Sequence, residues 1–496
     1  MMEKFRMWAC NECPSRLSWL IIITFPQIVK AGCPPYNGTH TMDRKARTHR
    51  LQQEDRRYLW HPYTQQRDWV KTDPLIIEQG DGVYVEDTEG RRYLDGSSSI
   101  WVNVHGHRKR ALDRALLAQL QRIAHTTLLG LSNVPAIELA KQLVALAPPG
   151  LTRVFYSDNG STAVEVALKM AFQYWQLRGG AYKQKTRFLH LGQAYHGDTL
   201  GAVSVGGIPL FHERFRPLLF PTHEAAPPDC YRCPLGLTFP ACRLACTGLV
   251  EQVLVRHHEE IAALIVEPMM LAAGGMIPMP PGYLTRLRQL CTHYRVLLIA
   301  DEVATGFGRT GRMFACEHEG VKPDLMAVGK GLTGGYLPLA ATLTTERIYR
   351  AFLGRYEDFK TFFHGHSYTG NPVGCAVALA NLEVFENERT LARLQPKIAA
   401  LRRLLEPLRA RPQVGDLRQL GLMVGIELVQ EKATKAPYPL AQRIGMRVAE
   451  EARRLGLLLR PLGNVIVLMP PLSTTVRELR QMVDLVTKAI TAVTER

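Results

Sequence analysis

Long apolar runs, internal repeats and low-complexity tracts are all absent from this chain of 496 residues. No segment approaches the ~20 apolar residues of a membrane span, so we expect no membrane partner. Ten cysteines are too few for a disulfide framework in a protein of this size. No stretch interleaves basic with aromatic residues, although the net charge is +16. We therefore expect no nucleic-acid partner, and the composition indicates an ordinary globular protein.

The first 57 residues differ from the rest of the chain. Residues 18–25, "SWLIIITF", follow basic residues and have the character of a signal-peptide core. The alternative is an upstream start codon, because Met42 precedes a plausible beginning for a cytoplasmic protein. We favour the start at Met42. We expect residues 1–57 to be an extension that is either disordered or a mis-assigned start, and the protein to be cytoplasmic.

Four cysteines form a cluster inside a proline-rich insertion: Cys230, Cys233, Cys242 and Cys246. Their spacing suits a structural zinc site, an oxidised loop or four reduced thiols. The second pair has three intervening residues instead of two, and no histidine lies within the cluster. The sequence leaves these alternatives open.

Residues 151–345 alternate apolar strands with amphipathic helices. We expect strands near 153–156, 187–191, 261–266, 296–300 and 324–330, and helices at 161–175 and 281–295. Continuously apolar strands separated by helices predict an α/β fold with a mostly parallel sheet covered by helices. We place the large domain at 111–385 and a smaller α/β domain at 386–496. Residues 58–110 are expected to pack with the small domain.

Lys330 ends the last of these strands and stands between two glycines, in "AVGKGLTGGYLP". Ligands bind at the carboxyl ends of strands in open α/β sheets. Desolvation there lowers the pKa of a lysine and makes its neutral amine available as a nucleophile. A surface lysine in a glycine-rich loop is the competing interpretation.

Asp301 ends another apolar strand, in "LLIADEVATGFGRTG", where burial penalises a carboxylate. A cation must therefore lie nearby. A salt bridge to Arg309 or Arg312 is one solution. The other is the protonated ring nitrogen of a cofactor such as pyridoxal phosphate, which a carboxylate keeps protonated. Together with Lys330, Asp301 favours the cofactor.

Two further turns suit the same ligand. Asn159, Gly160 and Ser161 lie between a strand and a helix, where backbone N–H groups bind phosphate. An ordinary helix cap is the alternative. Tyr195 and His196 follow the strand at 187–191, and an aromatic ring there can stack on a cofactor or belong to the core.

Over residues 58–490 these motifs resemble the class III (omega) aminotransferases, which are fold-type I enzymes dependent on pyridoxal phosphate. Lys330 lies 29 residues after Asp301, and the two flanking motifs are highly specific. The resemblance implies that Lys330 holds the cofactor covalently and that Asp301 binds its ring nitrogen. It further implies that Gly160 and Ser161 hold the phosphate and that Tyr195 stacks on the ring. Ser367 would reach the phosphate across the interface of a homodimer.

Within this class, "WHPYTQ", "DGSSSIWVNVHGH" and "LRPLGNVIVLMPP" resemble the diaminopelargonate synthases of biotin synthesis. That resemblance implies conversion of 8-amino-7-oxononanoate to 7,8-diaminononanoate with adenosylmethionine as donor, in two stages through pyridoxamine phosphate. The implied substrate-binding residues are Tyr63, which would also be catalytic, Trp101, Asp198, Arg309, Gly365 and Arg460. Arg460 would pair with the substrate carboxylate.

The chain departs from this family's pattern at Ile100, at His366-Ser367 and at Leu472. Adenosylmethionine-using members have tryptophan, Pro-Thr and an aromatic residue at those positions. Lysine is therefore an alternative donor. Another omega-aminotransferase, acting on diamines or beta-amino acids, is a second alternative. A basic binding protein with an inactive enzyme fold is a third, and Lys330 and Asp301 argue against it.

Overall fold

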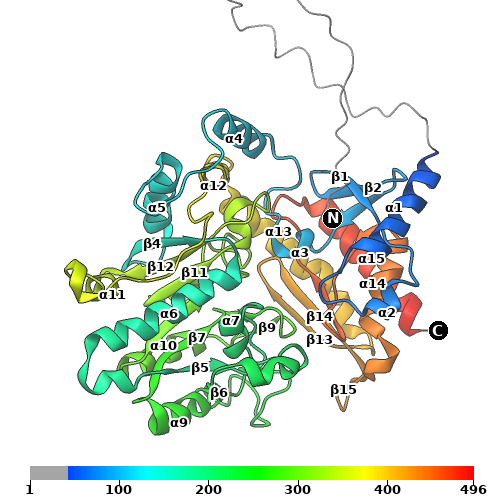
Figure 1. Ribbon diagram of the computed structural model, residues 1–496. Coiled ribbons are helices and arrows are strands. Elements are labelled where there is room, and N and C mark those ends of the chain that lie inside the picture. Colours follow the sequence, from blue (N-terminus) through cyan, green and yellow to red (C-terminus); the bar gives the residue numbers. More distant parts are fainter. Residues whose placement is uncertain (1–42, 496) are drawn as a thin grey trace, which may run out of the picture. The chain divides into compact units, whose positions relative to one another are not determined.

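The computed structural model describes residues 43–495, in two units that divide after Pro74 (Figure 1). The interpretations that concern residues 1–41 and a start at Met42 lie outside the described residues. Across residues 43–495, no helix is both long enough and apolar enough to cross a membrane.

The first unit contains two helices, α1 (Arg44–Tyr58) and α2 (Gln66–Trp69). The Asp43 side chain caps α1 by accepting a hydrogen bond from the Lys45 N–H. Asp55, on the last turn of α1, accepts hydrogen bonds from His61 and Trp69. Residues 44–57, expected to be disordered or a mis-assigned start, are therefore helical and joined to the segment that follows them.

The second unit is built on a seven-stranded sheet with helices around it (Figure 1). Its strands lie in the order β4 (Leu151–Ser157), β12 (Ala340–Thr345), β11 (Leu325–Val328), β10 (Leu297–Asp301), β7 (Ile261–Val266), β5 (Arg187–Leu191) and β6 (His223–Ala225). Only β12 runs against its neighbours in this sheet, β4 and β11, so the sheet is mostly parallel, as predicted.

The helices of this part are α4 (Arg110–Leu120), α5 (Val134–Leu146), α6 (Gly160–Arg178), α7 (Leu200–Ser204), α8 (Pro209–His212), α9 (Thr247–His257), α10 (Tyr283–His293), α11 (Glu346–Ala351) and α12 (Pro372–Asn387). Successive strand side chains point to opposite faces of a sheet. In β10, Ile299 belongs to the apolar cluster that contains α6, whereas Leu298 and Ala300 belong to the cluster that contains α10. Both faces of the sheet are thus covered, which explains why its strands are continuously apolar.

The carboxyl-terminal part forms a second, smaller α/β layer. An antiparallel sheet contains β13 (Val414–Leu420), β14 (Met423–Glu431), β15 (Ala436–Pro437) and β17 (Val465–Leu468). The helices here are α13 (Thr390–Leu405), α14 (Ile444–Arg454) and α15 (Val476–Thr494). The last of these has a capping box between Thr475 and Glu478.

A third sheet joins the beginning of this unit to its end. It contains β1 (Ile77–Asp81), β2 (Tyr84–Asp87), β3 (Arg92–Asp95) and β16 (Leu457–Leu458). Leu94 and Asp95 of β3 pair in parallel with Leu457 and Leu458 of β16. Residues distant in the sequence therefore share hydrogen bonds in this sheet, and the turn at residues 98–101 that carries Trp101 comes soon after β3.

Candidate functional site

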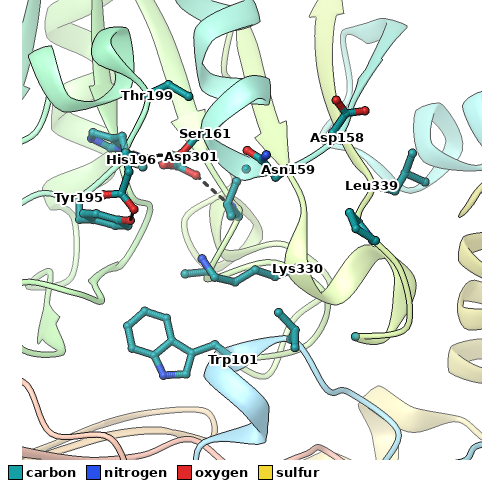
Figure 2. A pocket seen from close by; sticks show the side chains of 18 of the residues that line it. Trp101, Asp158, Asn159, Ser161, Tyr195, His196, Thr199, Asp301, Lys330 and Leu339 are labelled. Carbon is teal, nitrogen blue, oxygen red and sulfur yellow. Dashed lines mark hydrogen bonds and ion pairs between the residues drawn. The ribbon is translucent and has the colours of Figure 1, made fainter. Parts of the chain in front are cut away.

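A cavity of about 700 Å³ lies at the carboxyl ends of the parallel strands (Figure 2). The residues that follow four of the strands line it: Asp158 after β4, Tyr195 after β5, Glu267 after β7 and Lys330 after β11. Asp301, the last residue of β10, lines it too. The parallel topology thus gathers polar groups from distant parts of the sequence at one edge of the sheet.

Lys330 projects into this cavity from a short turn after β11. Its φ of 41° is in the left-handed region, which is costly for a residue with a side chain. Burial lowers the pKa of Lys330, and the nearby carboxylates Asp301 and Glu267 oppose that shift. Its Nζ lies 5.7 Å from the centre of the Trp101 ring, which borders the same cavity. The site therefore holds an amine whose neutral form is favoured by its surroundings.

Asp301 is paired with His196. The Oδ2 atom of Asp301 is 2.7 Å from Nδ1 of His196, and both side chains are almost fully buried. Its Oδ1 atom accepts a hydrogen bond from the Val303 N–H. The protein group that pairs with Asp301 is thus the His196 imidazole and not Arg309 or Arg312. The Nε2 atom of His196 is buried without a hydrogen-bond partner among the described residues.

Glu267 is a site residue that sequence reasoning did not assign. It is buried, and its two carboxylate oxygens accept hydrogen bonds from the N–H groups of Tyr195 and Ala272. Burial raises the pKa of Glu267 to about 7, although His196 opposes the shift. The sequence signal for Glu267 is its place directly after the apolar run 261–266, which matches the place of Asp301 after its own apolar run.

The neighbouring acid, Glu302, has a structural role. It is fully buried and accepts hydrogen bonds from the Thr305 hydroxyl and from the N–H groups of Ala315 and Cys316. These bonds close the loop that follows β10. Of the two adjacent acids, only Asp301 borders the cavity.

The amino end of α6 forms another wall. Asn159 caps this helix, and Gly160 and Ser161 begin it, so that its first N–H groups border the cavity. A side chain at position 160 would meet Val303 at 2.5 Å, so glycine is required there. Ser161 Oγ accepts a hydrogen bond from the Asp198 N–H, and the Tyr195 hydroxyl lies 2.8 Å from the Asp198 carboxylate.

Trp101 is held by an unusual turn, α3 (Ser98–Trp101), in which all four residues have positive φ angles between 40° and 68°. A left-handed turn costs roughly 1–2 kcal/mol per residue with a side chain. Asp95 restrains it by accepting hydrogen bonds from the N–H and the hydroxyl of Ser99. The Ser98 hydroxyl donates to the Met469 carbonyl. Contacts from β3 and from the carboxyl-terminal segment therefore stabilise a strained turn beside the cavity.

Four of the predicted site residues in the second unit are not among those that line the cavity: Arg309, Gly365, Ser367 and Arg460. Tyr63 belongs to the first unit, where it lies between α1 and α2. Gly365, Ser367 and Arg460 are exposed. Arg309 is buried, and its guanidinium donates hydrogen bonds to the carbonyls of Asn103 and Pro470. Burial lowers the pKa of Arg309 to about 10.

The four clustered cysteines line one small enclosed cavity, apart from the site at the sheet edge. They are free thiols, as are the other cysteines of residues 43–495. Burial raises the pKa of Cys230 to about 11, and the other three sulfurs contribute further. The thiol form is therefore favoured, and a metal ligand role stays a prediction.

Comparison with known proteins identifies the family of this chain. The family model "Aminotransferase class-III" matches residues 65–490. The chain belongs to the class III aminotransferases. An adenosylmethionine-8-amino-7-oxononanoate aminotransferase of Geobacter sulfurreducens is 54% identical, covering 90% of this chain and 98% of that protein. A relative of the same name from Nitratidesulfovibrio vulgaris is 56% identical over 91% of this chain and 83% of its own length.

Solved aminotransferase structures agree in fold. The adenosylmethionine-8-amino-7-oxononanoate aminotransferase of Methanocaldococcus jannaschii matches with a TM-score of 0.86 and 46% identity, covering 90% of this chain and 99% of that one. An omega transaminase from Pseudomonas jessenii, in complex with PMP, matches with a TM-score of 0.85 and 32% identity over 90% of this chain and 98% of its own. The predicted fold type I is confirmed.

Class III aminotransferases use pyridoxal phosphate, and the residues of this cavity fit that group. The cavity holds a buried amine for its aldehyde and a helix start for its phosphate. It also holds a buried carboxylate, Asp301, and an imidazole nitrogen of His196 without a partner. An aromatic ring at Tyr195 and the glycine at 160 complete the set.

Proposed function

We propose that this aminotransferase acts in biotin synthesis and converts 8-amino-7-oxononanoate to 7,8-diaminononanoate, with adenosylmethionine as the amino donor. The observation that carries this proposal is the Lys330 amine beside the buried Asp301–His196 pair. The chain that holds this site is 54% identical, over 448 residues, to a relative whose name states this donor and acceptor. The relative and this chain cover each other almost end to end.

The same side chains that line the cavity would hold the cofactor. The first N–H groups of α6, at Gly160 and Ser161, suit the phosphate because the positive end of the helix dipole lies there. Tyr195 supplies a ring for stacking. When bound, pyridoxal phosphate supplies the aldehyde that accepts the amino group and a ring that delocalises the charge left after proton loss.

Lys330 is the group that would bind the cofactor aldehyde and then carry the proton. Its pKa is lowered by burial, which favours the neutral amine that can accept a proton from the donor carbon. The nearest carboxylates, Asp301 and Glu267, oppose that shift and favour its return to the ammonium form. The same amine can therefore act as base and then as acid.

Asp301 would keep the ring nitrogen of the cofactor protonated, and His196 would position it. The His196 imidazole holds Oδ2 of Asp301 at 2.7 Å, and the Val303 N–H holds Oδ1. Each carboxylate oxygen retains a second lone pair. The carboxylate is thus fixed in a buried position, where its charge acts more strongly than at the surface.

For the substrates, we propose that Trp101 and Asp198 border the donor amine, since both line the cavity. Tyr63, Gly365 and Arg460 remain proposed contacts, with Arg460 pairing with the acceptor carboxylate. The two carbonyls that Arg309 binds indicate that it stabilises the loops around Trp101.

Lysine is the second candidate donor, and the departures at Ile100, His366-Ser367 and Leu472 favour it. Leu472 is buried, and its N–H donates to the Val104 carbonyl, close behind the turn that carries Trp101. The deciding experiment measures formation of 7,8-diaminononanoate from the keto acid with adenosylmethionine and with lysine side by side. Turnover with adenosylmethionine alone supports the proposal, and turnover with lysine alone supports the alternative. No product with either donor would refute both.

We also propose a cytoplasmic homodimer in which Ser367 serves the partner's cofactor phosphate. The exposure of Ser367 in a single chain is consistent with this. Mixing inactive Lys330→Ala subunits with inactive Ser367→Tyr subunits tests it, because hybrid dimers would regain one intact site. Mixtures that stay inactive while hybrids form would contradict a shared site. Cell fractionation tests the location.

A further inference from the structure

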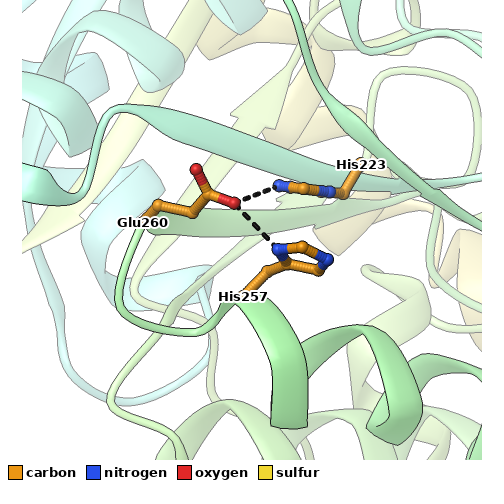
Figure 3. Close-up of side chains that lie close together, drawn as sticks. All are labelled: His223, His257 and Glu260. Carbon is orange, nitrogen blue, oxygen red and sulfur yellow. Dashed lines mark hydrogen bonds and ion pairs between the residues drawn. The ribbon is translucent and has the colours of Figure 1, made fainter.

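We propose that His223, His257 and Glu260 form a binding site for a divalent transition-metal ion such as zinc, at the edge of the seven-stranded sheet opposite to the aminotransferase cavity (Figure 3). One oxygen or nitrogen atom from each side chain lies within 4.8 Å of the other two. Two imidazoles and one carboxylate are a known zinc-binding set.

The distances between the three candidate ligand atoms are close to those between the ligand atoms of a bound metal ion. Oε1 of Glu260 is 3.0 Å from Nε2 of His223 and 2.9 Å from Nδ1 of His257. Ligand atoms about 2.1 Å from a tetrahedral ion lie roughly 3.4 Å apart. Small side-chain rotations would therefore admit an ion between the three groups. The dashed lines of Figure 3 converge on one carboxylate oxygen, so both histidines already point at one place.

The backbone holds the three residues in position. His223 is the first residue of β6, which pairs with β5, and His257 is the last residue of α9. The Glu260 carbonyl accepts hydrogen bonds from the N–H groups of Thr186 and Arg187, next to β5. The two imidazole rings are stacked, with centroids 4.2 Å apart. A rigid sheet edge and a helix end thus present the ligands.

Arg187 completes the site. Its Nε is 2.9 Å from Oε2 of Glu260, the oxygen that the histidines do not contact. A partner on the second carboxylate oxygen orients the first toward a metal, as outer partners of metal ligands do. Its positive charge also lowers the affinity, and so does competition from the two hydrogen bonds to Oε1. We therefore expect reversible binding and not a permanently retained ion.

The side chains are 17% exposed for His223, 38% for His257 and 35% for Glu260. An ion can thus enter from solvent, and a tetrahedral ion held by the three side chains keeps one coordination position for water or another ligand. Because the site joins β6, α9 and the start of β7, a bound ion would stabilise that edge. It would not touch the residues that line the aminotransferase cavity.

The test titrates the cofactor-loaded full-length protein, first freed of metal with a chelator, with Zn²⁺ and measures bound metal and melting temperature. We expect His223→Asn and Glu260→Gln each to weaken this binding by at least about tenfold, the scale on which even outer partners of a metal act. The matched control, His293→Asn, removes an exposed histidine at the end of α10 and should bind like the wild type.

Co²⁺ separates this site from the four cysteines, because thiolate ligands add an intense near-ultraviolet absorption that imidazole and carboxylate lack. If the wild type binds Zn²⁺ no more tightly than the His223→Asn variant does, the proposal is overturned. If the His223→Asn variant fails to fold, anomalous diffraction from wild-type crystals soaked in Zn²⁺ tests the site instead. An anomalous peak between the three side chains supports the site, and its absence refutes it. Aminotransferase turnover should be unchanged by the metal.

Discussion

Two carboxylate–imidazole pairs stand at opposite edges of the same sheet, and they differ mainly in burial. Asp301 and His196 are 2.7 Å apart, with side chains 4% and 0% exposed. Glu260 and His223 are 3.0 Å apart, with side chains 35% and 17% exposed. Similar groups at similar distances therefore experience very different dielectric surroundings.

This difference determines what each pair can do. In the cavity, burial reduces the screening of the Asp301 charge and pushes the amine of Lys330 toward its neutral form. At the wet edge, water and salt screen the charges, and an ion pair contributes about 1 kcal/mol or less. The buried edge with Asp301 is therefore suited to catalysis. The exposed edge with Glu260 is suited only to binding a ligand and stabilising the fold.

The largest effect is expected from Lys330→Ala, at the carboxyl end of β11. It should lower turnover by about 10⁴-fold, because both the covalent link to the cofactor and the proton carrier are lost. Lys322→Ala, which removes an exposed lysine before the same strand, is the control and should retain full activity. Steady-state rates of both variants, with visible absorption to follow bound cofactor, provide the measurement. Normal turnover of the Lys330 variant would refute its role.

Asp301→Asn should have the next largest effect, a loss of roughly 10²- to 10³-fold in turnover, the scale of a removed electrostatic contact. The amide has nearly the same shape but no charge to keep a ring nitrogen protonated. The comparison is Asp324→Asn at the opposite edge, where the carboxylate pairs with Arg288 and Arg347. We expect that variant to lose thermal stability but not turnover. Equal losses of turnover in the two variants would count against a special role for Asp301.

Glu267 should make stability depend on pH. Its folded pKa of about 7 exceeds the ordinary value of 4.5, so the folded state holds this proton more tightly. The resulting stabilisation is complete below pH 4.5 and is lost as the pH rises through 7, by about 3 kcal/mol in all. The Glu267→Gln variant should lack this dependence. Urea unfolding of the cofactor-free forms between pH 4.5 and 8 measures the difference, and parallel curves would contradict it.

The smallest effect is expected from His257→Asn at the exposed edge. Without metal, it should change the free energy of unfolding by less than about 1 kcal/mol and leave turnover unaltered. Chemical denaturation in the presence of a chelator is the measurement. A loss of several kcal/mol would show that exposure alone does not explain the contrast between the two edges.

Much of the fold could be predicted because its signals are local. The runs 187–191 and 261–266 became β5 and β7 residue for residue, since a strand covered on both faces has an unbroken apolar sequence. Asp301 could be found because it ends such a run, and Lys330 because it lies two residues beyond the end of another. Glu267 occupies the same position after β7 and was overlooked, although the same rule applies to it.

Other features depend on contacts between distant residues. The pairing of His196 with Asp301 joins positions 105 residues apart. The left-handed turn that carries Trp101 needs Asp95 and the carbonyl of Met469 to hold it. Nothing in "SSIW" predicts four positive φ angles, because the stabilising groups come from elsewhere in the chain.

The sequence by itself determined the α/β fold, the strand ends and the lysine and aspartate of the cavity, because hydrophobic periodicity and its interruptions are properties of neighbouring residues. Only the tertiary structure decided which side chain faces Asp301, which acid has its pKa raised to about 7 and which histidines share Glu260. Those outcomes depend on burial and on through-space distance, which the order of residues does not encode locally.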